Sequence, residues 1–199
     1  MAYHHGNLKE FLIQAGDEAL NLMGAEALSL RDIAKRAGVS HNAPYRHFHD
    51  RNDLIDSIVE RSLRELAEQI LSAPLLYPAT IRLQIQFVGR LFAQLAIHHP
   101  RKAHLVFSGV FSTGEKTGPI KACHRLLLLN LESILQEAAQ FELLPNTNCK
   151  TLALLLMALF RGLGVLYTNH LVGELSLSGD ALCYFTDMAA ENLLRPHLA

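Results

Sequence analysis

The chain of 199 residues carries 18 Lys and Arg against 19 Asp and Glu, so its formal net charge at pH 7 is −1, and 50% of its residues are hydrophobic. This composition excludes a disordered or fibrous protein and a uniformly basic nucleic-acid coat, but it leaves room for a local basic patch. The three cysteines form no CxxC pair, which favours free thiols in a reducing cytoplasm over a disulfide or a metal site.

The N-terminal part of the chain shows the apolar spacing and the start signals of two amphipathic helices. Asn7 and Glu10 have the form of a capping box, and the apolar repeat that follows ends at Gly24. Ser29 and Asp32 form a second box of the same kind, in front of a helix over residues 30–37. We therefore predict one helix over residues 7–23 and another over residues 30–37.

The rest of the chain continues the helical pattern. Asp50 is the predicted N-cap of a long helix that ends before Pro74. The further predicted helices cover residues 79–97, 101–107, 119–141, 148–170 and 178–194. Because no segment shows the two-residue period of a strand, the predicted fold class is all-α.

Residues 151–167 form the one segment whose apolar character suggests a membrane. Its uninterrupted apolar run extends only from Leu152 to Phe160, where Arg161 interrupts it, while a spanning helix needs about 20 apolar residues. We expect no membrane partner and predict a helix buried in the protein or at a subunit contact. Gly162 and Gly164 in this helix mark either a close approach of helices or a loose turn.

A short polar segment follows the second helix. Gly38 suits a left-handed turn, Val39 can fill the junction between helices, and the hydroxyl of Ser40 can cap a new helix. Pro44 is close enough to that start to be tolerated there. Two helices joined by a tight glycine turn predict a helix-turn-helix.

The side chains of this segment match the chemistry of DNA recognition. Asn pairs with adenine in the major groove, a small apolar side chain contacts the thymine methyl, and Tyr and Arg at helix ends hold phosphates. Between residues 29 and 51 there are five basic and two acidic side chains, so the basic charge lies where a groove helix would lie. The predicted DNA-contacting residues are Ser29, Arg31, Ser40, His41, Asn42, Ala43, Tyr45, Arg46, His47 and Arg51. The alternative is a compact helical hairpin in which Tyr45 and Phe48 only pack on the first helix.

Residues 29–54 resemble the N-terminal signature of the TetR family of bacterial transcriptional regulators. The matching residues are Ser29-Leu30-Arg31, Ile33-Ala34, Ala37-Gly38-Val39-Ser40, Tyr45, His47-Phe48, Arg51 and Leu54. The sequence departs from the family at Pro44, where many members carry Leu, and at Arg51, where Lys is usual. The resemblance implies an N-terminal three-helix DNA-binding domain over residues 1–50 and a larger helical ligand-binding and dimerisation domain over residues 51–199.

The resemblance also implies a function. The expected protein is a cytoplasmic, ligand-responsive regulator, in the first place a repressor, which binds a palindromic double-stranded DNA operator as a homodimer through its last two long helices. The alternative is a helical sensor or carrier of a small molecule whose DNA-binding head is inactive.

The C-terminal part offers candidates for the small-molecule inducer site. Six residues are predicted to line it: Phe87, Phe107, Phe111, His124, Phe160 and Tyr167. Aromatic residues at helical spacing are more often ordinary core, which is the competing interpretation. His98 and His99 point to different faces of a helix and cannot form a chelate, so no metal or other cofactor is expected. The sequence contains no glycine-rich phosphate loop, GxSxG or HExxH motif, and an enzyme is not predicted.

Overall fold

The computed structural model describes residues 8–78, 80–108, 117–141, 144, 148–169 and 178–195. Within these residues every regular element is a helix, which confirms the predicted all-α fold. The N-terminal elements are α1 (Leu8–Met23), α2 (Leu30–Arg36) and the single 3₁₀ turn η1 (Pro44–Arg46). The following helices are α3 (Arg51–Leu71), α4 (Ala73–Leu76), α5 (Ile81–His98), α6 (Pro100–Ser108), α7 (Thr117–Gln140), α8 (Cys149–Thr168) and α9 (Gly179–Leu194).

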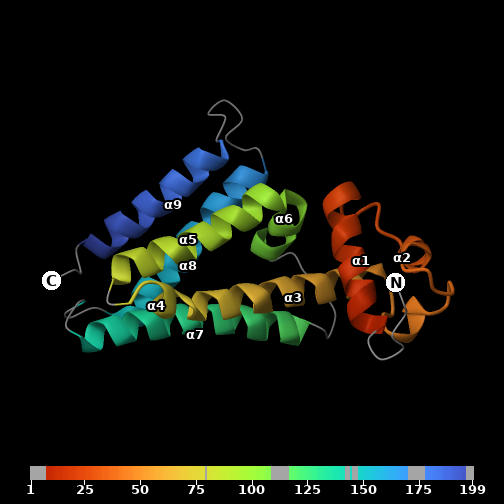
Figure 1. Ribbon diagram of the computed structural model, residues 1–199, viewed down its shortest axis with the longest axis horizontal. Coiled ribbons are helices and arrows are strands. Elements are labelled where there is room, and N and C mark those ends of the chain that lie inside the picture. The colour runs from red at the N-terminus through yellow and green to blue at the C-terminus, as the bar shows by residue number, and fades with distance from the viewer. Residues whose placement is uncertain are drawn as a thin grey trace.

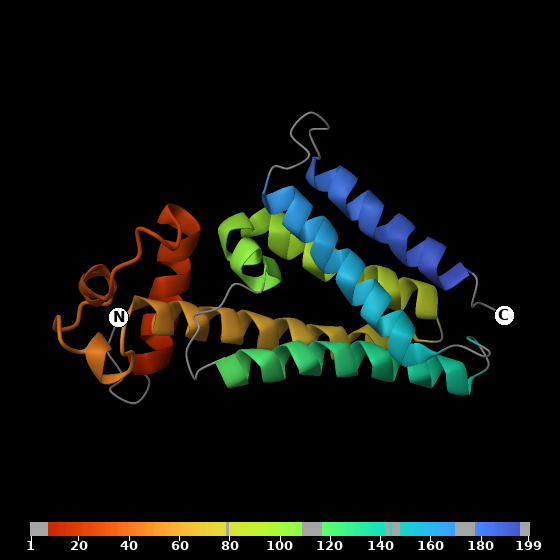
Figure 2. The same ribbon diagram turned by 180° about the vertical axis from the view of Figure 1, so that it is seen from behind.

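The molecule has a small head and a larger helical body, and α3 connects them (Figure 1). The head consists of α1, α2 and η1 at one end of the molecule. The helix α3 leaves the head and runs beside α7 along the body. The helices α5, α8 and α9 lie together on one side of this pair, above it in Figure 2. This arrangement carries α3 from the head into the body (Figure 1).

The head has its own apolar core. Leu12 and Leu20 of α1 pack with Ile33 of α2 and Phe48, and each of these side chains is almost fully buried. Leu54 and Ile58 of α3 belong to the same cluster. The first turns of α3 therefore complete the head core, and the domain boundary between residues 50 and 51 stays a prediction.

The core of the body joins all its long helices. Phe92 of α5, Phe107 of α6 and Phe160 of α8 form its aromatic centre. The ring centroid of Phe92 lies 5.7 Å from that of Phe107 and 6.0 Å from that of Phe160. The helix α9 is fastened to α5 by an ion pair in which Arg90 donates to Asp187 at 2.6 Å.

The predicted helix bounds agree with the structure apart from short shifts, with two exceptions. The short helix α4 is not among the predicted helices, because Pro74 indicates the end of the preceding helix. In the structure Pro74 occupies the first turn of a new helix, where its missing N–H costs nothing. The second helix of the helix-turn-helix is shortened to the turn η1. The predicted cap Asn7 lies outside the described residues.

Candidate nucleic-acid interface

The supporting helix α2 is fixed at both ends by the residues that the sequence singled out. The Ser29 hydroxyl accepts a hydrogen bond from the backbone N–H of Asp32 at 3.4 Å, which confirms Ser29 as the N-cap. Gly38 has φ +67°, the left-handed conformation that glycine adopts without strain, and the chain reverses there. The Val39 N–H then bonds back to the Ala34 carbonyl at 3.0 Å, which closes the turn.

The recognition segment, residues 40–47, is held by backbone hydrogen bonds. The Ala43 N–H donates to the Ser40 carbonyl at 2.9 Å, and the N–H groups of His47 and Phe48 both donate to the Pro44 carbonyl at 2.9 Å. The prediction that the Ser40 hydroxyl caps this helix is wrong, because the helical turn begins at Pro44 and its N-cap residue, Ala43, makes no side-chain bond. Ser40 supports the turn through its carbonyl instead.

The recognition segment separates buried from exposed residues. Ala43, Pro44 and Phe48 are buried, and Phe48 is only 1% exposed. The exposed side chains in and around the segment are those of Ser40, His41, Asn42, Tyr45, Arg46 and His47. Tyr45 is 57% exposed, so it does not pack as the helical-hairpin alternative requires, whereas Phe48 does. Ala43 is 9% exposed and offers the least surface of the predicted base-contacting residues.

The start of α3 beside this segment carries a reciprocal capping box. Asp50 accepts from the Asp53 N–H at 2.9 Å, and Asp53 accepts from the His49 N–H at 2.8 Å. The hydrogen bond from the Asp53 N–H lowers the pKa of Asp50, and the nearby His49 side chain adds to this effect. Asp50 is thus confirmed as the N-cap that sets the direction of α3.

Arg51 has a contact that the sequence did not reveal. Its Nη1 donates to the backbone carbonyl of Glu26 at 3.0 Å, so this exposed guanidinium ties the α1–α2 connection to the start of α3. The predicted phosphate contact by Arg51 therefore requires either a remaining N–H of the same fork or a change of this bond. Arg31 is exposed on α2, and Lys35 and Arg36 in the last turn of that helix are exposed as well.

The described residues among those predicted to line an inducer site do not gather around one cavity in the structure. Phe107 and Phe160 are buried in the aromatic centre of the core, as the competing interpretation proposed. The ring of Phe87 faces Tyr77 instead, with centroids 5.8 Å apart. Tyr167 is partly buried against the core, and Phe111 lies outside the described residues.

His124 belongs to a polar pair inside the body that the sequence revealed only in part. Its Nδ1 lies 3.4 Å from Nη1 of Arg161, whose Nη2 donates to the Phe107 carbonyl at 2.8 Å. Burial, and then the Arg161 charge, lowers the pKa of His124 to about 4, and burial also lowers the pKa of Arg161. Arg161 closes the C-terminal end of α6 with a cation, which opposes the negative end of the helix dipole. The sequence signal for this polar pair is Arg161, a single arginine that interrupts the apolar run of α8.

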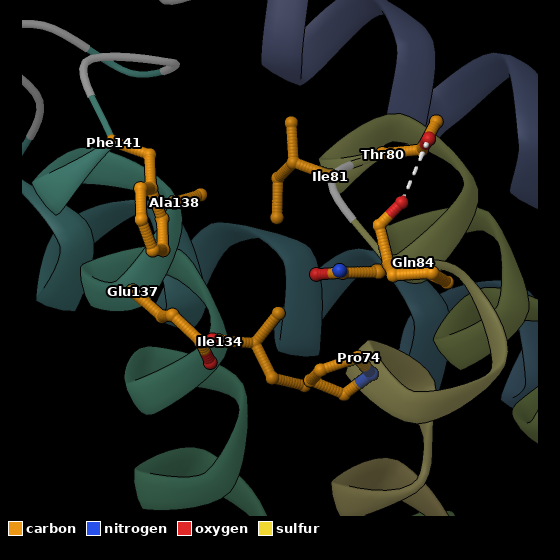
Figure 3. A pocket seen from close by; sticks show the side chains of 9 residues that line it. Pro74, Thr80, Ile81, Gln84, Ile134, Glu137, Ala138 and Phe141 are labelled. Carbon is orange, nitrogen blue, oxygen red and sulfur yellow. Dashed lines mark hydrogen bonds between the residues drawn. The ribbon is translucent and has the colours of Figure 1, made fainter.

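A cavity of about 390 Å³ lies at the end of the body that is remote from the head (Figure 3). It is partly open to solvent and is lined by Pro74 of α4, Ile81 and Gln84 of α5, and Ile134, Glu137 and Ala138 of α7, with Phe141 beyond the end of α7. None of the six predicted inducer-site residues lines it. A second, more open hollow of about 640 Å³ lies between the head and the body, beside Gly24, Arg101 and His104.

Other predicted features can be placed within the described part of the chain. Cys123, Cys149 and Cys183 are free thiols, and no three His, Cys, Asp or Glu side chains of the described residues gather as they would around a metal ion. The helix α8 is long and apolar enough to cross a membrane by length and composition alone, a test that core helices of soluble proteins also pass. It packs on α5, α6, α7 and α9, yet Leu154, Leu155 and Leu166 remain 49%, 51% and 42% exposed.

The head matches proteins of known type. Residues 12–58 match the model of the bacterial regulatory proteins of the tetR family. The HTH-type transcriptional regulator BetI of Yersinia pestis is 36% identical over 62 residues, which make up 31% of this chain and 31% of that protein. The tetracycline repressor protein class G of Vibrio anguillarum is 40% identical over 57 residues, or 29% of this chain and 27% of the relative. The chain thus aligns with less than a third of these curated relatives.

The fold of the whole chain is found in solved structures. A protein of unknown function from Rhodococcus sp. RHA1 superposes with a TM-score of 0.80 at 23% identity, over 100% of both chains. The transcriptional regulator FadR from Bacillus subtilis, solved in complex with stearoyl-CoA, has a TM-score of 0.69 at 19% identity, over 92% of this chain and 96% of its own. The repressor SmeT of Stenotrophomonas maltophilia, solved with triclosan, has a TM-score of 0.69 at 20% identity, over 96% of this chain and 91% of its own. The identities are low enough that these structures establish the fold alone, whereas the match in the head has a specific signature. Residues 12–58 of this chain are therefore similar to the N-terminal segment of the bacterial regulatory proteins of the tetR family.

Proposed function

We propose that this protein is a cytoplasmic transcriptional regulator, in the first place a repressor, which binds a palindromic DNA operator as a homodimer and releases it when a small molecule binds to the body. The observation that carries this proposal is the recognition segment, where exposed polar and cationic side chains stand on a buried frame of Ala43, Pro44 and Phe48. Side chains with no role in folding are available for a partner, and their chemistry fits base edges and phosphates.

The exposed residues of the segment have distinct proposed roles. His41 and Asn42 precede the 3₁₀ turn and read bases, because the first residues of a recognition helix contact base edges. Tyr45, Arg46 and His47 hold phosphates, together with Arg31 from the supporting helix. Arg51 contributes to the phosphate contacts while it ties Glu26 to α3.

Measurements of binding to operator DNA test these roles with matched variants. Asn42→Ala should cost about 1–3 kcal/mol on the operator and relax the base choice at one position in each half-site. Arg46→Ala should weaken matched and scrambled duplexes alike and reduce the salt dependence by about one phosphate per subunit. Lys121→Ala, which removes an exposed cation from α7, is the control and should change neither property. Equal binding of the matched and scrambled duplexes by the unaltered protein would contradict the proposal.

The homodimer is proposed from the outer surface of α8 and α9. Leu154 and Leu155 of α8 are about half exposed, and Tyr184, Phe185 and Met188 of α9 are 60%, 45% and 39% exposed. Large apolar side chains gathered on neighbouring helices are typical of a protein contact surface. A second copy of this chain would bring two heads to half-sites related by a two-fold axis, as a palindromic operator requires.

The small-molecule response is proposed from the cavity in the body and from the fold. FadR and SmeT share the fold and were solved with stearoyl-CoA and triclosan, respectively. A body that offers a cavity and is joined to the head by the continuous helix α3 has a physical route for coupling the two functions.

A further inference from the structure

The cavity at the remote end of the body has apolar walls and a small number of polar groups. Ile81 of α5 and Ile134 and Ala138 of α7 line it and are almost fully buried, and Pro74 and Pro78 line it as well. Phe141 is 69% exposed and stands at one side of the space in Figure 3. With a volume of about 390 Å³, the cavity is within the range of small-molecule sites, about 300–1,000 Å³.

The side-chain polar groups of the cavity include hydrogen-bond acceptors and one carboxylate. Gln84 is 8% exposed, and its amide reaches from α5 into the space between α5 and α7 (Figure 3). Its Nε2 donates one of its two N–H groups to the Tyr77 carbonyl at 2.9 Å, and its Oε1 can accept from a ligand. Thr80 likewise turns its O–H toward the Pro78 carbonyl, 3.4 Å away, and Glu137 contributes a carboxylate.

Two helix ends near the cavity act in opposite senses. The Thr80 side chain does not cap the first turn of α5, and the backbone amides of that turn favour an anion. The last turn of α7 carries no basic side chain, and the negative end of this helix dipole favours a cation. Each end carries about half an elementary charge, so the two nearly cancel, and the exposed carboxylate of Glu137 adds a full negative charge to the lining.

We propose that this cavity binds an organic ammonium ion that has N–H donors and an apolar, preferably aromatic, body. The N–H groups donate to Gln84 Oε1 and the Glu137 carboxylate, while the apolar part lies against Ile81, Ile134 and Phe141. The proposed function is needed only for the further step that such a cation acts as the effector.

Calorimetric titration of the full-length protein with three compounds of one shape tests the inference. The compounds are 3-phenylpropylammonium, the neutral 3-phenylpropanol and the anionic 3-phenylpropanoate. The ammonium should bind most tightly, about fivefold or more above the alcohol, and the carboxylate should bind most weakly. Glu137→Gln should remove the preference for the ammonium over the alcohol and leave the affinity for the alcohol nearly unchanged.

Glu132→Gln is the matched control, because it removes the same charge from the same helix outside the cavity and should preserve the preference. Ala138→Leu fills the cavity and should weaken all three compounds. The inference is overturned if the carboxylate binds best, which would assign the site to the amides of α5, or if the two glutamine variants behave alike.

Operator binding, measured in parallel, separates this inference from the proposed function. If ammonium binding depends on Glu137 but the protein shows no preference for an operator, the ammonium site is supported and the proposed function as a regulator is overturned. Specific operator binding by a protein that shows no Glu137-dependent ammonium preference would do the reverse.

Discussion

The ammonium group of Lys102, on α6, lies 3.0 Å from the carboxylate of Asp17, on α1. The same carboxylate oxygen accepts from Arg61 of α3 at 3.0 Å, so one acceptor from the head binds two cations from the body. Lys102 is 6% exposed, which shields its bond from solvent. The neighbouring Arg101 donates to the Asn21 carbonyl at 2.9 Å, so the start of α6 holds the end of α1 at two points.

Removal of the Asp17 carboxylate should destabilise the junction between head and body. In Asp17→Asn, Lys102 and Arg61 lose their shared anion, and a buried cation without its partner costs about 3 kcal/mol. The free energy of unfolding from urea titration measures this loss. Glu18→Gln, an exposed neighbour on α1, is the control and should change stability by less than about 0.5 kcal/mol. Equal effects of the two substitutions would contradict the buried link.

The two glycines of α8 should respond to alanine in opposite directions. A Cβ at Gly164 would lie 2.4 Å from the ring of Phe107, so Gly164→Ala should separate α6 from α8 and cost about 1–3 kcal/mol. Nothing lies within 4 Å of a Cβ at Gly162, where alanine should stabilise the helix by about 0.5–1 kcal/mol. Thermal unfolding of both variants measures the difference, and a destabilised Gly162→Ala would disagree with this packing.

His124 should make the stability of the body depend on pH. Its folded pKa, about 4, lies below the ordinary value of 6.5, so the unfolded chain binds the extra proton between these values. The contribution of the neutral His124 ring to the free energy of unfolding is complete above pH 6.5 and is lost as the pH falls toward 4. After allowance for the solvent that reaches this partly buried ring, we expect a loss of about 1–2 kcal/mol.

Unfolding measured at pH 7.5 and pH 4.5 tests this dependence against His124→Gln. The variant should show a smaller decrease between the two pH values, and the difference between the proteins cancels the titration of all other groups. Parallel curves for the two proteins would show that the ring does not titrate as its burial requires.

A charge on the outer surface of α8 should dissociate the proposed homodimer. Leu155 is 51% exposed, and Leu155→Glu would place a carboxylate in the apolar contact, where a buried charge without a partner costs several kcal/mol. Sedimentation at micromolar concentration should give twice the chain mass for the unaltered protein and a single chain for the variant. Leu75→Glu, at an 84% exposed leucine of α4, should remain dimeric. A monomeric unaltered protein that binds the operator tightly would refute the arrangement.

Local signals made the head predictable. Ser29, Gly38 and Asp50 act within three or four residues of their own positions, so the residue types alone indicate the caps and the turn. The start of the recognition helix was predicted too early, because a serine in front of a helical segment can support it through its hydroxyl or, as here, through its carbonyl. The residue type does not distinguish these two bonds.

The long-range contacts were not predictable from one sequence. Arg51 and Glu26 are 25 residues apart, and Lys102 and Asp17 are 85 residues apart, so no periodicity relates them. The position of the aromatic residues predicted for the inducer site was not predictable either, since the same apolar ring can line a cavity or fill a core. The structure uses Phe107 and Phe160 to fill the core, and it forms its described cavity from proline, isoleucine and glutamine side chains at another end of the body.

The separation of buried from exposed side chains in the recognition segment has a consequence for the evolution of this protein. Its shape depends on Gly38, on backbone hydrogen bonds and on buried side chains such as Phe48, whereas His41, Asn42, Arg46 and His47 contribute almost nothing to that shape. Substitutions at exposed positions of this kind usually change stability by no more than about 0.5 kcal/mol. Under the proposed function, descendants of this gene can therefore acquire new target sites one residue at a time, without passing through a sequence that does not fold.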